Sequence, residues 1–172
     1  MDEMIPAWRG DDLVAVEKLA VHRLGLRHKA VSVFVMRGTQ VLVQQRATGK
    51  YHSAGLWANT CCTHPRWGED PRDCATRRLH EELGITGLAP VHTQRLEYRA
   101  DVGCGLIEHE VVDIFVAQAN ETMTLQPDPA EVSATRWVEL ADLARDIHRD
   151  PRPYTRWLAV YLDTPMGLIF RT

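Results

Sequence analysis

Two runs of β-forming residues near the start of the chain are separated by a short polar connection. The runs are residues 30–36 and 41–45, and the connection between them, residues 37–40, contains a glycine. Valine-rich and aromatic runs on either side of a glycine-containing turn are typical of a β-hairpin. We therefore predict a hairpin over residues 30–45, and a further strand in the apolar stretch 56–64.

The sequence from Asp70 to Gly84 predicts a helix with both ends marked. Asp70 can cap the helix, and Pro71 suits its first position. Leu79 and Leu83 lie four residues apart and so share one face. Gly84 stands where a helix end favours a positive φ angle, so the helix is expected to span residues 71–83.

The second half of the chain predicts three strands followed by two helices, over residues 94–100, 105–118, 133–138, 140–146 and 154–162. Strands and helices interleave without a regular βαβ alternation. This order favours an α/β or α+β fold, in which a mixed sheet is flanked by helices. A chain of 172 residues can bury one full core, so residues 1–172 are expected to form a single domain.

Charge and composition narrow the class of function. The formal net charge is -3 and no stretch is dense in Lys or Arg, which argues against nucleic-acid binding. The apolar runs are shorter than the roughly 20 residues of a membrane-spanning helix. The first ten residues lack the order of a signal peptide. We expect a cytoplasmic protein, monomeric or weakly self-associating, with free thiols at its four cysteines, Cys61, Cys62, Cys74 and Cys104.

Two predicted strands carry paired polar residues on one face. Residues two apart point to the same side of a strand, so Cys62 and His64 share a face while Cys61 points away. The same rule places Glu108 beside Glu110, and two adjacent carboxylates repel unless a cation or a proton lies between them. The alternative is a solvent-exposed pair of glutamates, with Cys62 in the core.

The predicted helix carries charges four residues apart, Arg77 with Glu81 and Arg78 with Glu82. A solvated face held by ion pairs is one interpretation. The order of the residues supports another, because the segment resembles the Nudix box, the signature of a superfamily that binds divalent metal and diphosphate. The segment reads Thr63-x5-Glu69-x7-Arg77-Arg78-Leu79-x-Glu81-Glu82-x-Gly84-Ile85.

Two positions depart from that signature. Thr63 stands where the box usually has Gly, and Arg78 stands where it usually has Glu. Replacing this acid by arginine removes a metal ligand of a Nudix hydrolase and offers a guanidinium to phosphate. The resemblance therefore implies a bound diphosphate, with chemistry other than simple hydrolysis.

Motifs spread over residues 18–157 resemble those of the type 1 isopentenyl-diphosphate isomerases, which are Nudix-fold proteins with the same departures. The matching segments are 17–22, 46–50, 56–65, 98–101 and 108–111. This resemblance implies a reversible shift of the double bond between isopentenyl and dimethylallyl diphosphate. It makes Cys62 and Glu110 the acid-base groups, with the Tyr98 hydroxyl placed to relay or orient a proton. Which of the two groups donates first is left open.

The resemblance also implies ligands for metal and substrate. It implies an octahedral site for Mn²⁺, Zn²⁺ or Mg²⁺ formed by His22, His28, His64, Glu108 and Glu110. The interval from His22 to His28 is one residue shorter than in the family, so His52 is an alternative ligand. Glu82 is expected to help hold a second Mg²⁺ on the diphosphate. The substrate-binding residues are expected to be Lys18, Arg46, Lys50, Arg78 and, as an aromatic wall, Trp157.

Two other functions fit parts of this pattern. A Nudix diphosphate hydrolase would place water at the metal, and Arg78 together with the Cys62-His64 pair argues against it. A catalytically inactive module would bind a prenyl diphosphate without isomerising it.

Overall fold

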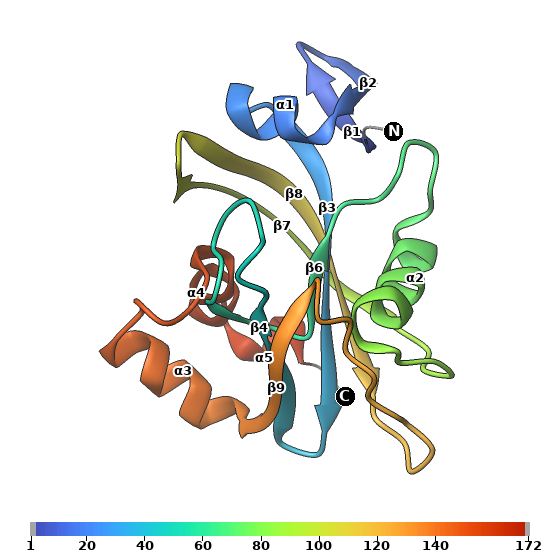
Figure 1. Cartoon of the computed structure of the whole chain (residues 1–172), viewed down its shortest axis with the longest axis vertical. Helices are drawn as coiled ribbons and strands as arrows, with labels where there is room; N and C mark the ends of the chain where they lie inside the picture. The colour runs from blue at the N-terminus through green and yellow to red at the C-terminus, as the bar shows by residue number, and fades with distance from the viewer. Residues whose placement is uncertain (1–2, 171–172) are drawn as a thin grey trace.

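The computed structural model describes residues 3–170, so the first two and last two residues of the expected domain lie outside the described part. Within this range one mixed sheet contains nine strands. They are β1 (Met4–Arg9), β2 (Asp12–Glu17), β3 (Arg27–Arg37), β4 (Gln40–Arg46), β5 (Trp57–Ala58), β6 (Cys61–Thr63), β7 (Val91–Gly103), β8 (Leu106–Gln118) and β9 (Val132–Glu139). The helices are α1 (Lys18–Leu24), α2 (Pro71–Leu83), α3 (Leu140–Arg149), α4 (Arg156–Asp163) and α5 (Met166–Ile169) (Figure 1).

Strand β3 is the centre of the sheet. Strand β8 pairs with it in parallel from Arg27 to Met36 and so occupies the whole of one edge. The other edge is shared by three strands, which pair in turn with different parts of β3: β1 at His28, β6 at residues 31–33 and β4 at residues 36–37. Strand β7 continues the sheet beyond β8, and β9 pairs with β4.

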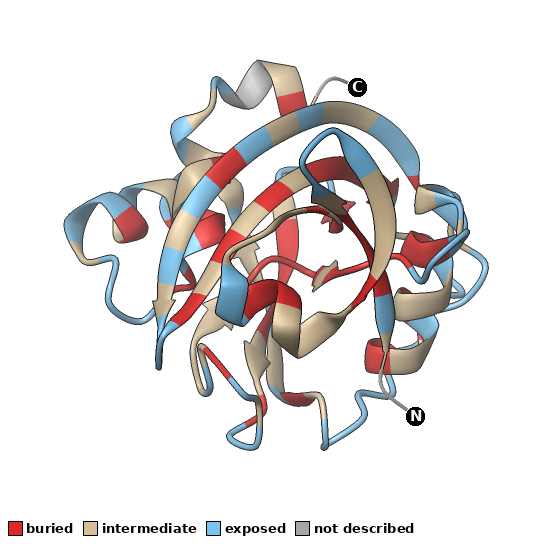
Figure 2. Cartoon of the chain, turned by 90° about the horizontal axis from the view of Figure 1, so that it is seen from above, coloured by how far each residue is buried: buried red, intermediate tan, exposed pale blue. Residues whose placement is uncertain are grey.

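Two apolar layers cover the two faces of the sheet. Because side chains alternate along a strand, Phe34 of β3 packs with α4 while its neighbour Val35 packs with α2. Figure 1 shows α2 on one side of the sheet and α3 and α4 on the other. Buried positions lie in the interior, and exposed positions lie in peripheral loops and on the outer faces of the helices and of strand β7 (Figure 2). Because apolar side chains cover both faces of the sheet, its polar side chains are confined to the positions that these two layers leave free.

Most of the predicted elements are confirmed. The hairpin corresponds to β3 and β4, the helix from 71 to 83 is α2, and the later strands and helices are β7, β8, β9, α3 and α4. The Asp70 side chain accepts a hydrogen bond from the Arg72 N–H, and Gly84 ends α2 with φ of 66°. Such a cap is worth about 1 kcal/mol. The local signals at both ends of α2 were therefore sufficient to place it.

The single strand predicted over residues 56–64 is wrong, because this segment forms two short strands that pair with different partners. Strand β5 pairs with β4, and β6 pairs with β3. Between them the Thr60 hydroxyl donates to the Leu42 carbonyl and accepts from the Val35 N–H. The Asn59 amide donates to the Val33 carbonyl. Side chains thus take the place of ladder hydrogen bonds where the segment changes partner.

The elements before residue 27 were not predicted. Strands β1 and β2 form an antiparallel hairpin, and α1 follows directly. The Glu17 carboxylate caps α1 by accepting from the Leu19 and Ala20 N–H groups, both at 2.7 Å. With only seven residues, α1 is too short to show an apolar period, and its position depends on tertiary packing.

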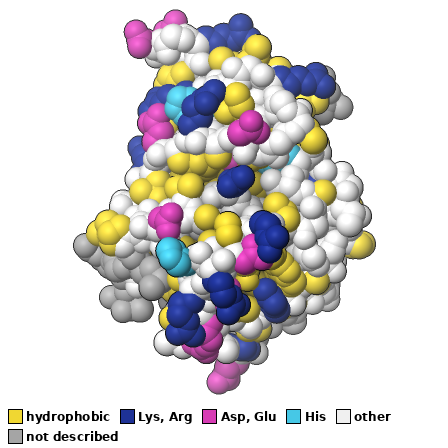
Figure 3. Space-filling model, turned by 90° about the vertical axis from the view of Figure 1, so that its left-hand side faces the viewer, with side chains coloured by type: hydrophobic (Ala, Val, Ile, Leu, Met, Phe, Trp, Pro, Cys, Tyr) yellow, Lys and Arg dark blue, Asp and Glu magenta, His cyan; other side chains and the backbone are white. Residues whose placement is uncertain are grey.

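Among the described helices, none is long and apolar enough to span a membrane. On the face seen in Figure 3, Lys and Arg side chains lie among Asp and Glu side chains.

The turn after α2 allows a test of backbone strain against steric contact. A Cβ atom on Gly84 would lie 2.8 Å from the Gln126 Cβ, whereas a Cβ on Gly87, which also has positive φ, would meet nothing within 4 Å. We expect Gly87→Ala to lower the free energy of unfolding by about 1–2 kcal/mol. Gly84→Ala should cost about 1–3 kcal/mol more, because the turn is also overpacked. Urea denaturation measures both, and equal losses would contradict the steric argument.

Candidate active site

One pocket gathers side chains from seven parts of the fold. Helices α1, α2 and α4, strands β4, β6 and β8 and the loop between β4 and β5 all contribute to its wall. The lining residues are Lys18, Arg46, Lys50, Tyr51, His52, Cys62, Thr63, His64, Arg78, Glu82, Glu108, Glu110 and Trp157. Three other predicted site residues, His22, His28 and Tyr98, are buried and contact this group rather than line the pocket. The structure therefore brings all the predicted site residues to one region.

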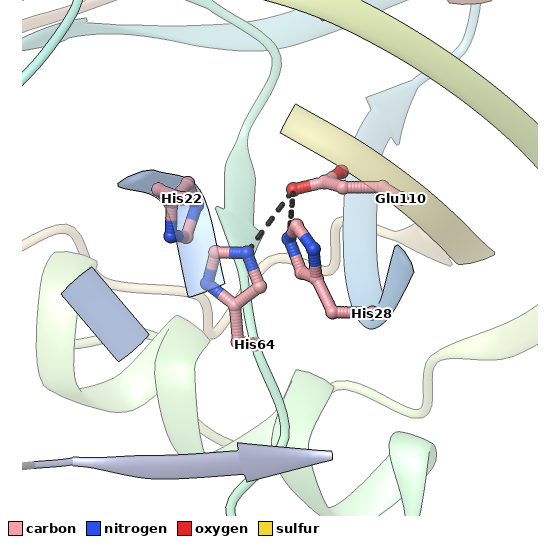
Figure 4. A group of neighbouring side chains, drawn as sticks. All are labelled: His22, His28, His64 and Glu110. Carbon is pink, nitrogen blue, oxygen red and sulfur yellow. Dashed lines mark hydrogen bonds and ion pairs between the residues drawn. The ribbon is translucent and has the colours of Figure 1, made fainter. Parts of the chain in front are cut away.

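A buried cluster of histidines surrounds the Glu110 carboxylate. His64 Nε2 lies 3.1 Å from Glu110 Oε1, and His28 Nε2 lies 3.8 Å from the same oxygen. His22 completes the group, whose potential ligand atoms all lie within 4.8 Å of one another (Figure 4). The rings come from α1, β3 and the residue after β6, so the cluster exists only in the folded chain.

Backbone contacts orient two of these rings. His22 Nδ1 lies 2.7 Å from the Lys18 carbonyl and His28 Nδ1 lies 2.7 Å from the Leu26 carbonyl. Since a carbonyl only accepts, both Nδ1 atoms donate, and each ring keeps the Nε2 lone pair free. His22 Nε2, His28 Nε2 and His64 Nδ1 have no hydrogen-bond partner among the described residues. Buried, unpaired ring nitrogens of this kind are typical of metal ligands.

A second group lies beside the first and shares His22 with it. It consists of His22, His52 and Glu108, again with ligand atoms within 4.8 Å of one another. His52 Nε2 lies 3.6 Å from Glu108 Oε1. Burial lowers the pKa of His22 to about 4 and that of His52 to about 3, so both rings are neutral at physiological pH. Neutral imidazole is the form that binds metal.

The two carboxylates of β8 point to the same face and share one partner. The Tyr98 hydroxyl lies 2.9 Å from Glu108 Oε2 and 2.8 Å from Glu110 Oε2. A hydroxyl carries one proton, so it can donate to only one of them at a time. Burial, followed by the charge of Glu110, raises the pKa of Glu108. The pair therefore needs a proton or a cation to remain buried, and the available nitrogen and oxygen donors fit a divalent ion.

The two neighbouring cysteines lie on opposite faces of the sheet. Cys62 lines the pocket, whereas Cys61 is fully buried in the layer beneath α2. The Cys62 thiol donates to Asn59 Oδ1 at 3.0 Å, and Asn59 Nδ2 donates to Ser32 Oγ. The Ser32 hydroxyl, 3.1 Å from the Cys62 sulfur, is then free to donate to it. Both hydrogen bonds orient the sulfur, and neither Ser32 nor Asn59 was among the predicted site residues.

The protein groups around Cys62 keep its side chain protonated. Burial raises the pKa of the Cys62 thiol, and the hydrogen bond from Ser32 offsets only part of this effect. The neighbouring His64 is itself kept neutral, because burial lowers its pKa. Cys62 is thus a thiol in the protein described here.

Basic side chains form another wall of the pocket, and α2 supplies its central pair. Arg78 Nη2 donates to Glu82 Oε1 at 2.5 Å, as the spacing of four residues predicted. Gln44 Nε2 donates to the other Glu82 oxygen at 2.8 Å, which fixes the buried carboxylate from two sides. Glu82 lines the pocket beside Arg78.

Glu131 was missed by the sequence analysis. Its carboxylate pairs with Lys50 and lies 3.5 Å from Arg78 Nη2. Glu131 belongs to an irregular segment before β9, and its carbonyl accepts from the Ala47 N–H. No periodicity or motif marks such a residue, so only the fold could reveal it.

Comparisons with known proteins agree with this geometry. The NUDIX domain family matches residues 26–158. Two solved structures share the fold: a protein of Deinococcus radiodurans, with a TM-score of 0.75 and 14% identity over 94% of this chain and 98% of that one, and a MutT NUDIX hydrolase of Burkholderia pseudomallei, with a TM-score of 0.62 and 22% identity over 81% and 98%.

Curated relatives match over nearly the full length. The isopentenyl-diphosphate Delta-isomerase of Cereibacter sphaeroides is 63% identical, covering 99% of this chain and 96% of that protein. The proteins of the same name from Dinoroseobacter shibae and Ruegeria pomeroyi are 58% and 53% identical, covering 100% and 99% of this chain and 98% and 94% of those proteins. The chain therefore belongs to the isopentenyl-diphosphate Delta-isomerase family of NUDIX-domain proteins.

Proposed function

We propose that this chain catalyses the reversible conversion of isopentenyl diphosphate to dimethylallyl diphosphate in isoprenoid biosynthesis. The observation that carries the proposal is a single pocket in which a thiol, a buried carboxylate and several cations converge. The relatives named isopentenyl-diphosphate Delta-isomerase support the same reaction. A proton is added to the terminal carbon of the substrate and another is removed from C2, so the atoms balance without a co-substrate.

The basic wall is proposed to bind the diphosphate. Lys18, Arg46, Lys50 and Arg78 all line the pocket. Arg46 Nε and Arg78 Nε have no hydrogen-bond partner among the described residues, which leaves both guanidinium groups with donors for phosphate oxygens. Anchoring the diphosphate in this way would place the short hydrocarbon part beside Cys62 and Glu110.

Cys62 and Glu110 are proposed to exchange the two protons. An alkene is a very weak base, so its protonation requires a strong acid held in a site from which water is excluded. Glu110 is only 6% exposed, and the Tyr98 hydroxyl at 2.8 Å can orient its proton. A bound divalent ion would supply positive charge that makes protonated Glu110 more acidic. The hydrogen bonds from Ser32 and to Asn59 hold the Cys62 sulfur in the pocket as the second group.

The tertiary carbocation formed by protonation must be protected from water. Trp157 lines the pocket at 2% exposure and can present its π-system to this charge. Cation–π attraction to a desolvated cation is worth about 2 kcal/mol, or about thirtyfold in rate. Arg46 lies 5.2 Å from the centre of the same ring, so the orientation of Trp157 is coupled to the basic wall.

The identity of the ions and the setting of the enzyme are also proposals. Mn²⁺, Zn²⁺ and Mg²⁺ all accept nitrogen and carboxylate ligands such as those of the histidine cluster. The Glu82 carboxylate, next to the basic wall, suits a Mg²⁺ carried by the diphosphate. We further propose that the enzyme acts in the cytoplasm, as a monomer or a weak homo-oligomer.

Product analysis in D2O tests the proposed reaction. The purified protein is incubated with isopentenyl diphosphate and Mg²⁺, and NMR follows the substrate. We expect dimethylallyl diphosphate with deuterium in the new methyl group. A Nudix hydrolase would instead release phosphate, and an inactive binding module would leave the substrate unlabelled. Either of those results would overturn the proposal.

The neighbouring cysteines Cys61 and Cys62 provide a matched pair of variants. Cys62→Ala removes the pocket thiol and should lower kcat by about 10²–10⁴-fold, the usual contribution of an acid-base group. Cys61→Ala changes only the opposite layer and should leave kcat unchanged. Steady-state kinetics on both variants, with circular dichroism as a check of folding, measures the difference. If Cys61→Ala were the inactive variant, the assignment of the two faces would be wrong.

Removal of metal should lower the stability of the fold. Ligand binding at 100 times Kd stabilises a protein by about 2.7 kcal/mol. For a domain of this size, returning Mn²⁺ to the stripped protein should therefore raise Tm by about 5–10 °C. Glu110→Gln should lose most of this shift, whereas the exposed residue change His80→Ala should keep it. Equal shifts in all three proteins would place the bound ion elsewhere.

Variants of Arg78 and Arg77 distinguish an effect on substrate binding from an effect on helix stability. Arg78 lines the pocket, whereas Arg77 pairs with Glu69 and Glu81 and does not line it. Arg78→Ala should raise KM more than it lowers kcat, and weaken binding of inorganic pyrophosphate in calorimetry. Arg77→Ala should lower Tm and leave KM unchanged. A similar rise in KM for both variants would show that the helix, rather than the Arg78 guanidinium, is responsible.

A further inference from the structure

Glu131 has no role in the mechanism proposed above, although it pairs with two cations of the basic wall. Its Oε2 atom contacts Lys50 Nζ, and its Oε1 atom lies 3.5 Å from Arg78 Nη2. Lys50 and Arg78 line the pocket, whereas Glu131 is not one of the lining residues. One carboxylate thus spans two cations that the proposed function assigns to the diphosphate.

Two of the acids that pair with Arg78 differ in how firmly they are held. The Glu82 side chain is only 5% exposed, and Gln44 Nε2 donates to it at 2.8 Å. The Glu131 side chain is 25% exposed, and its pairing partner Lys50 is 20% exposed. Glu131 can therefore turn into solvent when a more highly charged anion reaches the two cations, whereas Glu82 stays in place.

The backbone of Glu131 keeps its side chain close to the basic wall. The Glu131 carbonyl accepts from the Ala47 N–H at 3.0 Å, and Ala47 begins the loop between β4 and β5. The Glu131 N–H donates to the Asp128 carbonyl at 3.0 Å, and the Asp128 N–H donates to the Glu82 carbonyl at 2.9 Å. The segment is thus attached both to this loop and to the end of α2. A displaced carboxylate remains tethered, at an effective concentration on the order of millimolar.

We propose that Glu131 is an internal competitor of the diphosphate, which weakens the binding of substrate and product alike. This inference rests on the diphosphate site of the proposed function. Two anions on one ammonium group repel each other, so a bound phosphate drives the carboxylate away, and the carboxylate returns when the diphosphate leaves. The competition weakens binding about three- to tenfold. Because affinity differences lie mostly in dissociation rates, product stays bound for a shorter time.

Binding of inorganic pyrophosphate tests this role apart from the isomerisation. Calorimetry with Mg²⁺ compares the full chain with Glu131→Gln and with Glu121→Gln, which removes the same charge from an exposed acid outside the pocket. Glu131→Gln should lower the Kd of pyrophosphate about three- to tenfold. It should lower KM for isopentenyl diphosphate by a similar factor without raising kcat, because ground and transition states are bound more tightly alike. Glu121→Gln should match the unaltered chain.

A double-mutant cycle separates direct competition from a general repulsion between negative charges. Lys50→Met removes one of the two cations for which Glu131 competes. In that background Glu131→Gln should tighten pyrophosphate binding by less than about twofold. Repulsion through space would tighten binding by the same factor with or without Lys50, and that result would overturn the inference.

Two further results would also overturn it. Weaker pyrophosphate binding by Glu131→Gln, shown by circular dichroism to be folded, would make Glu131 a ligand of the Mg²⁺ carried by the diphosphate. Unchanged binding with a lowered Tm would make Glu131 a structural partner of Lys50. Tighter binding in a chain that does not isomerise the substrate would support the inference and remove the proposed reaction instead. Failure of the unaltered chain to bind pyrophosphate would overturn both.

Discussion

Burial of two adjacent carboxylates is the constraint around which the rest of the site is arranged. Glu108 and Glu110 are 3% and 6% exposed, and they stand on the same face of β8. Taking such charges out of water costs several kcal/mol each unless they are paired. Tyr98 contacts one oxygen of each, and the histidines surround the remaining oxygens. Tyr98 and the histidines thus compensate for the negative charge that the fold buries at Glu108 and Glu110.

The register of the sheet sets the geometry of this compensation. In the parallel pairing of β3 with β8, His28 lies opposite Glu110, and on the other edge of β3 Ser32 lies opposite Cys62. A slip of one residue would turn Glu110 to the opposite face of the sheet, away from the histidines. The alternation that buries Phe34 and Val35 on opposite faces therefore also fixes the relative positions of the acid-base groups.

The sequence predicted those parts of the fold and site that have a local signal. Alternation was sufficient to put Cys62 and Cys61 on different faces, and spacing of four residues paired Arg78 with Glu82. The break at Asn59 and Thr60 could not be foreseen, because it depends on hydrogen bonds to strands far away in the sequence. His52 and Glu131 lie in irregular segments, where neither period nor cap exists, and their positions follow from tertiary packing alone.

The basic wall, like the carboxylate pair, gathers side chains of one charge that need partners of the opposite charge. Here the gathered charges are positive and the partners are acids. Arg78 is balanced by Glu82 and approached by Glu131, which also pairs with Lys50. These two acids differ in freedom, because Gln44 fixes Glu82 whereas Glu131 is partly exposed. Under the proposed function a diphosphate must therefore replace the Glu131 carboxylate on Lys50 and Arg78. A ligand with several negative charges can do so, whereas a neutral prenyl group gains nothing from that exchange. The wall thereby favours the charged end of the substrate and leaves the hydrocarbon end to the layer that contains Trp157.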